Sequence, residues 1–227
     1  RLPAAFHDSF AALQWLCSQA GCERGSSKVK VGSGGAEPEP WLDSADFSKV
    51  FIAGESAGGT IVHHVAMRAF NHNHESESED RSSLHPLKIQ GLIFIHPGFF
   101  RWAKTRTQEE LDCPQDEFMS WDMADACIQL TLPADYPVDT NPYFNPIPAI
   151  SGLGPKFGFP PKSLVALADH DALHFFVLEY IKALRNVGHH VEELISHGVG
   201  HVFFINQPES EQTHTLKNTI VKFIKQQ

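Results

Sequence analysis

Long hydrophobic runs are absent from this sequence of 227 residues. No run approaches the roughly 18 apolar residues that a membrane-spanning helix needs. The chain also lacks a starting Met, and its first residues show no signal-peptide pattern. These absences predict a protein that has no membrane partner and that works, by default, in the cytoplasm.

Positive charge is scarce compared with negative charge. The sequence has 18 Lys and Arg against 27 Asp and Glu, which gives a formal net charge of -9 at pH 7. A protein that binds the phosphate backbone of a nucleic acid needs clustered Lys and Arg side chains on one face. The charge balance therefore argues against a nucleic-acid partner, and no pattern indicates an oligomeric state.

Cysteine is sparse, with Cys17, Cys22, Cys113 and Cys127 as its only occurrences. None of them forms a Cys-x-x-Cys pair or the framework of a small secreted disulfide protein. No Asn-x-Ser/Thr acceptor for glycosylation occurs either. We therefore expect free, buried thiols.

The remaining composition is that of an ordinary globular protein. Hydrophobic residues make up 42% of the chain and charged residues 20%. A chain of this length can enclose one sizeable hydrophobic core without a second domain. We expect one domain over residues 1–227.

Apolar runs of strand length alternate with helical patterns along most of the chain. A helical pattern opens the sequence and ends near Gly21. The expected strands are residues 49–54, 89–95, 163–168 and 191–196. Helical periodicity follows the first, third and fourth strands, which predicts an α/β fold whose mostly parallel sheet has helices on both faces.

Three stretches break this alternation. Residues 23–40 lack periodicity and indicate a surface loop, and residues 71–83 are polar and acidic. Residues 98–159 hold short helical pieces, such as 119–130, and proline-rich turns over 137–148. A stretch of this length between strands is usually a lid or a substrate-facing insertion, so we interpret 98–159 as a helical cap within the domain.

Aromatic residues are frequent in the expected cap. The sequence predicts core and pocket-wall positions equally for four of them, Phe99, Phe100, Trp102 and Trp121. Whichever of them line a pocket would help to set its specificity.

Gly54, Ser56 and Gly58 form the pattern Gly-x-Ser-x-Gly between an expected strand and an expected helix. In this context the pattern indicates a nucleophilic Ser on a sharp, strained turn, with small neighbours where other chain segments pass close by. We expect Gly54 and Gly58 to supply that room. The N–H group of Ala57, at the start of the helix, is the expected oxyanion donor.

A Ser nucleophile needs a His to accept its proton and a carboxylate to orient that His. On this type of sheet the chain order is Ser, then Asp or Glu, then His, each after a strand. Asp171 follows the third strand, and His201 follows the fourth in a segment with Gly198 and Gly200. We therefore predict the triad Ser56, Asp171 and His201.

Position separates His201 from the other His residues, of which the sequence has 14 in all. His197, just before the Gly-rich loop, is the second choice as base. Others lie within a helix, in the acidic loop or at a turn, and are expected to be structural or solvated: His63, His64, His72, His74, His189 and His190.

Asp169 competes with Asp171, because it lies on the same loop and either carboxylate can reach the imidazole. Asp171 is preferred. His170 and His174 lie beside these carboxylates, but no third ligand has a convincing spacing for a metal ion. We expect no metal and no cofactor.

Together these residues resemble the plant carboxylesterases of the hormone-sensitive-lipase-like branch of the α/β-hydrolases, and the likeness runs nearly end to end. The nucleophile motif and the Gly-Val-Gly-His motif at 198–201 are its most specific landmarks. The others are residues 1–5 (Arg-Leu-Pro-Ala-Ala), 39–42, 46–51, 63–64 and 141–146. A departure lies at Asp169, where the family usually has Gly.

In that family a His-Gly-Gly-Gly oxyanion segment precedes the Arg-Leu-Pro-Ala-Ala stretch. This sequence has no such segment, so it resembles a family member without its amino-terminal portion. The resemblance implies a fold that is incomplete on that side, with two oxyanion donors absent and one sheet edge exposed. Weak catalysis and poor solubility are then expected of the chain alone.

The resemblance leaves three functions open. The first is hydrolysis of small or medium carboxylic esters through an acyl-serine intermediate, with a small-molecule ester as substrate. The second is hormone binding, since the gibberellin receptors resemble this family but lack a working catalytic His, a residue that His201 supplies here. The third is a lyase of the 2-hydroxyisoflavanone dehydratase type, which reuses the same scaffold.

Overall fold

The computed structural model describes residues 1–22, 39–71, 84–133, 136, 141–153 and 162–226. The described residues form one parallel sheet whose strand order follows the chain, β1-β2-β3-β4. Its strands are β1 (Val50–Glu55), β2 (Ile89–Ile95), β3 (Ser163–Ala168) and β4 (Val191–Ser196). All four predicted strands are confirmed to within one residue at each end.

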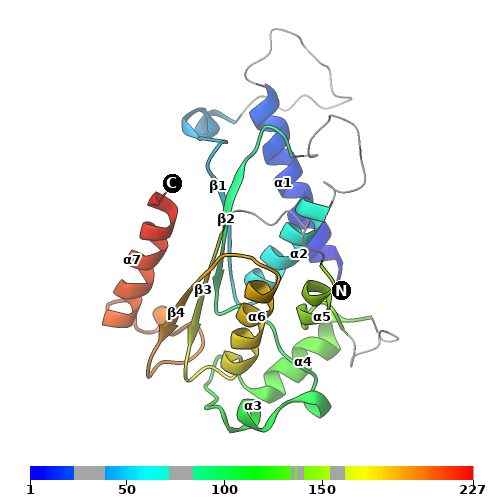
Figure 1. The fold of residues 1–227 in the computed structure, drawn as a ribbon, viewed down its shortest axis with the longest axis vertical. Coiled ribbons are helices and arrows are strands. Elements are labelled where there is room, and N and C mark those ends of the chain that lie inside the picture. The colour runs from blue at the N-terminus through cyan, green and yellow to red at the C-terminus, as the bar shows by residue number, and fades with distance from the viewer. Residues whose placement is uncertain (23–38, 72–83, 134–135, 137–140, 154–161, 227) are drawn as a thin grey trace.

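Helices connect the strands and open and close the chain (Figure 1). The α-helices are α1 (Ala4–Cys22), α2 (Ala57–Asn71), α3 (Gln108–Asp112), α4 (Trp121–Thr131), α5 (Ile147–Ser151), α6 (His174–Asn186) and α7 (Glu211–Lys225). The 3₁₀-helices are η1 (Pro40–Ser44), η3 (Ala103–Thr105) and η4 (Phe203–Ile205).

The two faces of the sheet bury different residues, because successive side chains of a strand point to opposite sides. In β2, Phe94 belongs to the large core that includes α6, whereas Ile93 packs with Phe223 of α7. Figure 1 shows α7 on one face of the sheet and α2 and α6 on the other. The predicted α/β fold with helices on both faces is confirmed.

The segment between β2 and β3 carries η3, α3, α4 and α5. Its buried residues Trp121, Ile128 and Ile150 belong to the same hydrophobic core as β2, β3 and α6. The helix predicted over 119–130 begins two residues later, because the Ser120 hydroxyl accepts a hydrogen bond from Met123 N–H and caps α4. The described part of this segment therefore shares the core of the sheet, with α3 and α5 packed against α6.

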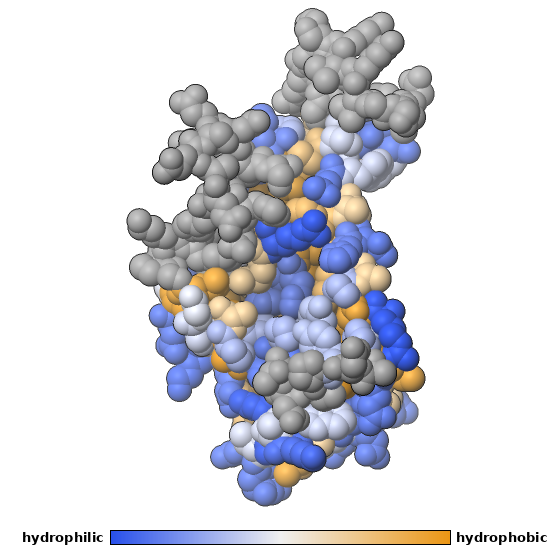
Figure 2. Space-filling view, turned by 90° about the vertical axis from the view of Figure 1, so that its right-hand side faces the viewer, coloured by the Kyte–Doolittle hydropathy of each residue, from blue (hydrophilic) through white to orange (hydrophobic). Residues whose placement is uncertain are grey.

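The aromatic residues of this segment divide unevenly between the core and the surface. Phe99, Phe100 and Trp121 are buried in the large core, and Trp102 is partly buried against it. On the face seen in Figure 2, hydrophilic and hydrophobic residues are intermixed around the residues drawn in grey.

Three predictions concern segments that the structure covers only in part. The predicted loops at 23–40 and 71–83, with His72 and His74, lie almost wholly outside the described residues, as does part of 137–148. Cys113 is a buried free thiol as expected, whereas Cys127 is a free thiol that is exposed rather than buried. Among the described helices, none has the length and apolar character to cross a membrane.

The carboxyl ends of the strands meet at one edge of the sheet. Glu55 pairs with Ile95, and Ala168 pairs with Ser196, so neighbouring strands end at the same level. The residues that follow the strands therefore lie close together although the sequence separates them widely.

Candidate active site

Ser56 occupies a strained turn between β1 and α2. Its φ angle is 49°, in the left-handed region that side chains disfavour. The turn is tied to the residues after β2, since Ser56 N–H donates to Ile95 O at 2.9 Å and Gly98 N–H donates to Ser56 O at 2.8 Å. These bonds hold a partly exposed Ser side chain at the carboxyl edge of the sheet.

The space around this turn is tight at Gly54 and Gly59. A Cβ atom added at Gly54 would lie 2.2 Å from the carbonyl oxygen of Gly58, and one at Gly59 would lie 2.7 Å from Pro97 Cβ. Gly58 was expected to supply room, and this prediction is wrong. Apart from its chain neighbours and the backbone of α2, no described atom lies within 4 Å of a Cβ built at Gly58, so no other segment crowds this position.

His201 links Ser56 to Asp171. Its Nε2 lies 2.9 Å from Ser56 Oγ, and its Nδ1 lies 2.7 Å from Asp171 Oδ2. Both His201 and Asp171 are 2% exposed, so this chain of hydrogen bonds is shielded from solvent except at Ser56. The three residues predicted from the sequence thus lie together at the edge of the sheet.

Asp169 and Asp171 have different partners. The second oxygen of Asp171, Oδ1, accepts a hydrogen bond from Leu173 N–H at 2.9 Å, so both carboxylate oxygens are engaged. Asp169 instead binds His197 Nδ1 and Gly198 N–H, at 2.9 and 2.7 Å. Asp169 therefore fixes the turn after β4, and Asp171 contacts the imidazole of His201.

The surroundings of His201 favour its charged form. Burial lowers the pKa of His201, but the hydrogen bond to Asp171 and the negative charges of Asp171, Asp116 and Glu55 raise it more. The net result is a pKa above the ordinary value for His. The imidazole is thus prepared to hold a proton taken from Ser56.

Ala57 is the first residue of α2 and is exposed. The first N–H groups of an α-helix have no partner within the helix, and the positive end of the helix dipole lies there. The N–H group of Ala57 follows the nucleophile position directly, which is the geometry expected of an oxyanion donor.

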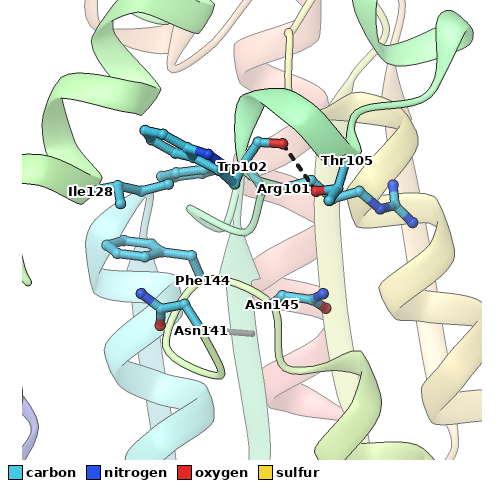
Figure 3. Close-up of a pocket in the computed structure, with 8 residues that line it drawn as sticks. Arg101, Trp102, Thr105, Ile128, Asn141, Phe144 and Asn145 are labelled. Carbon is cyan, nitrogen blue, oxygen red and sulfur yellow. Dashed lines mark hydrogen bonds between the residues drawn. The ribbon is translucent and has the colours of Figure 1, made fainter. Parts of the chain in front are cut away.

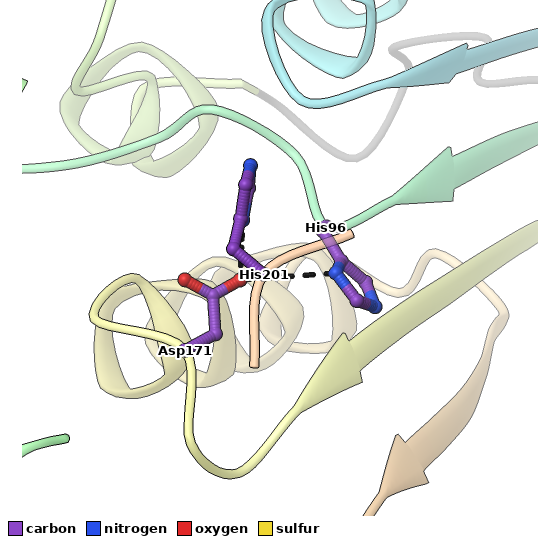
Figure 4. Close-up of side chains that lie close together, drawn as sticks. All are labelled: His96, Asp171 and His201. Carbon is purple, nitrogen blue, oxygen red and sulfur yellow. Dashed lines mark hydrogen bonds and ion pairs between the residues drawn. The ribbon is translucent and has the colours of Figure 1, made fainter. Parts of the chain in front are cut away.

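His96 lies against the triad, although the sequence did not single it out. It directly follows β2, has a φ angle of 45° and is 1% exposed. Its Nδ1 accepts a hydrogen bond from Val202 N–H at 2.8 Å and lies 3.9 Å from Asp171 Oδ2. Figure 4 shows how close the side chains of His96, Asp171 and His201 lie. The sequence feature that could have indicated His96 is its position directly after a buried strand, because residues that follow the parallel strands meet at the carboxyl edge of the sheet.

His96, Asp171 and His201 offer three ligand atoms within 4.8 Å of one another, from residue types that bind zinc. The lone pair of His96 Nδ1 already accepts the Val202 N–H, and His201 Nδ1 is bonded to Asp171. A metal ion would have to displace both hydrogen bonds, so these residues fit a hydrogen-bonded network better than a metal centre.

The other described His residues have structural partners or lie at the surface. His63 Nδ1 lies 3.1 Å from the Tyr180 hydroxyl, and His64 Nε2 lies 3.1 Å from Tyr143 O. His189 is buried, with Nε2 2.8 Å from Ser163 Oγ. His197, the second choice as base, contacts Asp169 and is exposed.

A hollow lies within the segment between β2 and β3 (Figure 3). Its lining residues are Phe100, Arg101, Trp102, Thr105, Ile128, Asn141, Phe144 and Asn145. None of the triad residues lines this hollow, so it is separate from the hydrogen-bonded chain of Ser56 and His201.

A parallel sheet with a Ser–His–Asp chain at its carboxyl edge defines the α/β-hydrolase class. A family model described as alpha/beta hydrolase fold matches residues 1–205. The chain belongs to this family.

The resemblance to plant carboxylesterases is confirmed by two relatives from Arabidopsis thaliana. The chain is 32% identical to "Probable carboxylesterase 13" over 99% of its own length and 62% of that protein. It is 30% identical to "Probable carboxylesterase 4, mitochondrial" over 98% of its length and 52% of that protein. The chain thus spans between half and two thirds of the length of these relatives.

Solved structures agree with this fold. The hyperthermophilic esterase from the archaeon Pyrobaculum calidifontis superposes with a TM-score of 0.71 at 20% sequence identity. The superposition covers 99% of this chain and 61% of the archaeal one. At this identity the likeness establishes a shared fold.

Proposed function

We propose that the protein hydrolyses carboxylic esters of small or medium acyl groups, with Ser56, His201 and Asp171 as its catalytic residues. The observation that carries the proposal is the hydrogen-bonded chain from Ser56 Oγ through the imidazole of His201 to Asp171, with distances of 2.9 and 2.7 Å. The similarity to proteins named carboxylesterase supports the same chemistry.

In the proposed reaction, Ser56 Oγ attacks the acyl carbon of the ester while His201 Nε2 accepts the hydroxyl proton. The N–H group of Ala57 donates to the oxyanion of the tetrahedral intermediate. His201 then gives the proton to the departing alcohol, which leaves an acyl group on Ser56. Water, deprotonated by His201, releases the acid and restores the hydroxyl.

Asp171 fixes the tautomer of His201 in this scheme. Its carboxylate accepts a hydrogen bond from Nδ1–H, which leaves the lone pair of Nε2 free to act as the base. The buried negative charge also stabilises the imidazolium that forms during each half-reaction.

We further propose that residues 98–159 form a cap over the substrate. This segment follows β2, and its residues Cys113 and Asp116 contact the loops that carry Asp171 and His201. Such a position supports a role in selecting the acyl or alcohol group, as is common for insertions at the carboxyl edge of a sheet.

The test is a Ser56→Ala substitution, assayed with p-nitrophenyl acetate and p-nitrophenyl butyrate. Turnover by the unchanged chain should be lost, because no other described hydroxyl contacts His201. As a second readout, a fluorophosphonate should label Ser56 covalently, since labelling requires an activated hydroxyl but no complete hydrolysis cycle. Turnover and labelling that persist in the Ser56→Ala variant would contradict the proposal. The absence of both turnover and labelling in the unchanged chain would contradict it as well.

Of the two other functions, the same geometry disfavours the receptor, and an experiment separates the dehydratase from the esterase. A receptor that only binds its ligand has no need of an imidazole bonded to Ser56. A dehydratase of the isoflavanone type would release water from its substrate, so product analysis with a 2-hydroxyisoflavanone separates it from an esterase. The cytoplasmic location stays a prediction, since the name of one relative includes the word mitochondrial.

A further inference from the structure

Two consecutive backbone N–H groups at the candidate base are held by side chains from distant segments. His201 N–H donates to Asp116 Oδ2 at 2.6 Å, and Val202 N–H donates to His96 Nδ1 at 2.8 Å. Asp116 lies between α3 and α4, and His96 follows β2. Both hydrogen bonds act on the peptide units around His201 rather than on its imidazole, although the ring of His96 also lies beside that imidazole, with the two centroids 5.7 Å apart.

The backbone at this point needs such support. Val202 has a φ angle of 47°, and a β-branched residue in the left-handed region costs roughly 1–3 kcal/mol. A strained conformation of this kind persists only where the surroundings hold it in place. Without acceptors for its two N–H groups, the segment would relax and the imidazole would move with it.

Both carboxylate oxygens of Asp116 have contacts that hold the side chain in place. Its Oδ1 accepts hydrogen bonds from Phe118 N–H and Met119 N–H, each at 2.8 Å, so the carboxylate closes its own turn. Its Oδ2 packs against Gly200, where an added Cβ would lie 1.8 Å away. The lack of a side chain at Gly200 is therefore what allows Asp116 to approach the backbone of His201.

His96 is suited to act as an acceptor. Burial lowers its pKa to about 4, against smaller opposing effects of Asp171 and Asp116, so the imidazole is neutral near pH 7. A neutral imidazole whose Nδ1 accepts the Val202 N–H carries its proton on Nε2. The rings of Phe203 and Phe204 pack beside it, with centroids at 5.6 and 5.9 Å.

We propose that His96 and Asp116 are positioning residues that hold the backbone at residues 201–202, so that His201 Nε2 reaches Ser56 Oγ. This inference rests on the proposed function, because it assigns both residues to the same reaction. The inference also gives the segment between α3 and α4 a part in the reaction. That part requires Asp116 to remain packed against Gly200.

The test at His96 compares two substitutions of similar size. In His96→Asn, the amide oxygen stands as many bonds from the backbone as Nδ1 does and can accept the Val202 N–H, and Asn tolerates the positive φ. In His96→Leu the acceptor is lost. We expect kcat for p-nitrophenyl butyrate to fall about 10- to 100-fold in the Leu variant, with KM changed about twofold or less. The Asn variant should keep kcat within about threefold.

The test at Asp116 uses Asp116→Asn, with Glu117→Gln as the matched control. The amide oxygen can keep the bonds to Phe118 and Met119, which leaves the NH₂ group facing His201 N–H. We expect kcat to fall about tenfold.

The titratable groups that face His201, and so influence its pKa, are Asp171, Asp116, Glu55 and His96.

The same substitution should also move the pH profile. Losing the negative charge of Asp116 lowers the pKa of His201, so the acidic limb of kcat/KM should move to lower pH. Glu117→Gln should leave both kcat and the limb unchanged, since Glu117 contacts Asn206 instead. A purely structural role for Asp116 would not shift this limb.

Each outcome bears on the inference. Unchanged kcat and an unmoved limb in folded His96→Leu and Asp116→Asn proteins would overturn it. Urea unfolding of each variant supplies the second measurement: if both variants are unfolded, the residues support the fold rather than the position of His201, and the inference also fails. If Ser56→Ala retains turnover, the proposed function has failed. If Ser56→Ala is inactive while the other variants match the unchanged chain, only this inference has failed.

Discussion

The backbone at Ser56, His96 and Val202 adopts positive φ angles, and these are the described residues other than Gly that do so. All three lie at or beside the hydrogen-bonded chain of the candidate triad. Such conformations cost about 1–2 kcal/mol each and persist where tertiary contacts hold them. The strain is concentrated where side chains must point to one spot, and hydrogen bonds from neighbouring loops balance it.

At the residue scale, Asp171 and Asp169 form a natural pair for substitution. Asp171→Asn should reduce kcat about 10³- to 10⁴-fold, because an amide cannot hold His201 in the tautomer that leaves Nε2 free. Asp169→Asn should reduce kcat by about tenfold at most, since Asp169 acts on the turn at His197 and Gly198. Steady-state kinetics with p-nitrophenyl butyrate would measure both. Equal losses in the two variants would contradict the assignment of Asp171.

The pH dependence of the reaction is set by the same residues. His201 must be neutral to accept a proton, and its pKa lies above the ordinary value of 6.5. We therefore expect kcat/KM to fall below a midpoint that lies above pH 6.5, as His201 becomes protonated. A pH–rate profile checks this, and a midpoint below 6.5 would contradict the net effect of Asp171, Asp116 and Glu55 on His201.

At the scale of single elements, the strand-to-helix turn from β1 to α2 depends on which positions are crowded. The first turn of α2 lies under the residues that follow β2, and Gly98 N–H donates to Ser56 O. The helix can approach this closely only because Gly59 has no side chain. The turn therefore acts as a unit with the end of β2.

Gly58 and Gly59 should respond in opposite ways to the same substitution. Gly59→Ala places a Cβ 2.7 Å from Pro97 Cβ and should destabilise the fold by about 1–3 kcal/mol. Gly58→Ala meets no described atom within 4 Å other than its chain neighbours and the backbone of α2, and should gain up to about 1 kcal/mol from helix propensity. Urea unfolding midpoints of the two variants measure the difference. A loss of stability in Gly58→Ala would show that its surroundings are tighter than described.

At the scale of the whole molecule, buried His residues distribute titratable groups through the core. Burial lowers the pKa of His63 well below its ordinary value, and it lowers the pKa of His96 and His189 to about 4. These side chains are neutral in the folded protein near pH 7 and are hydrogen-bonded as neutral rings. Protonation of these side chains in the folded protein therefore costs free energy.

Mild acid should consequently destabilise the fold. The unfolded chain binds protons at His96 and His189 below about pH 6.5, and the folded chain does not do so until about pH 4. The free energy of unfolding should therefore decrease between pH 6.5 and 4, by up to about 1.4 kcal/mol per pH unit for each group. His201 acts in the opposite sense: its raised pKa contributes stability at low pH that is lost as pH rises through that pKa.

Urea unfolding at pH 7.5 and pH 5.0 would measure this loss. A His189→Gln variant removes one titrating group, and the amide can still bond to Ser163 Oγ. The variant should show a smaller decrease in stability between the two pH values. Equal decreases in both proteins would mean that His189 does not contribute.

The sequence by itself determined the four strands, the order of helices and strands, and the triad candidates. Strands and helices leave local periodicities, and the chain order of Ser56, Asp171 and His201 follows the strands that carry them. The choice of Asp171 over Asp169 rested on the expected place of an acid after the third strand, and the hydrogen bonds agree with it.

Only the tertiary structure decided which side chains surround these residues. His96 contacts Val202, and Asp116 contacts His201, across separations of 106 and 85 residues. No local pattern marks such partners, because their contact depends on how strands and loops pack in space. The same holds for Gly58 and Gly59, which are neighbours in the sequence but differ in what lies next to them.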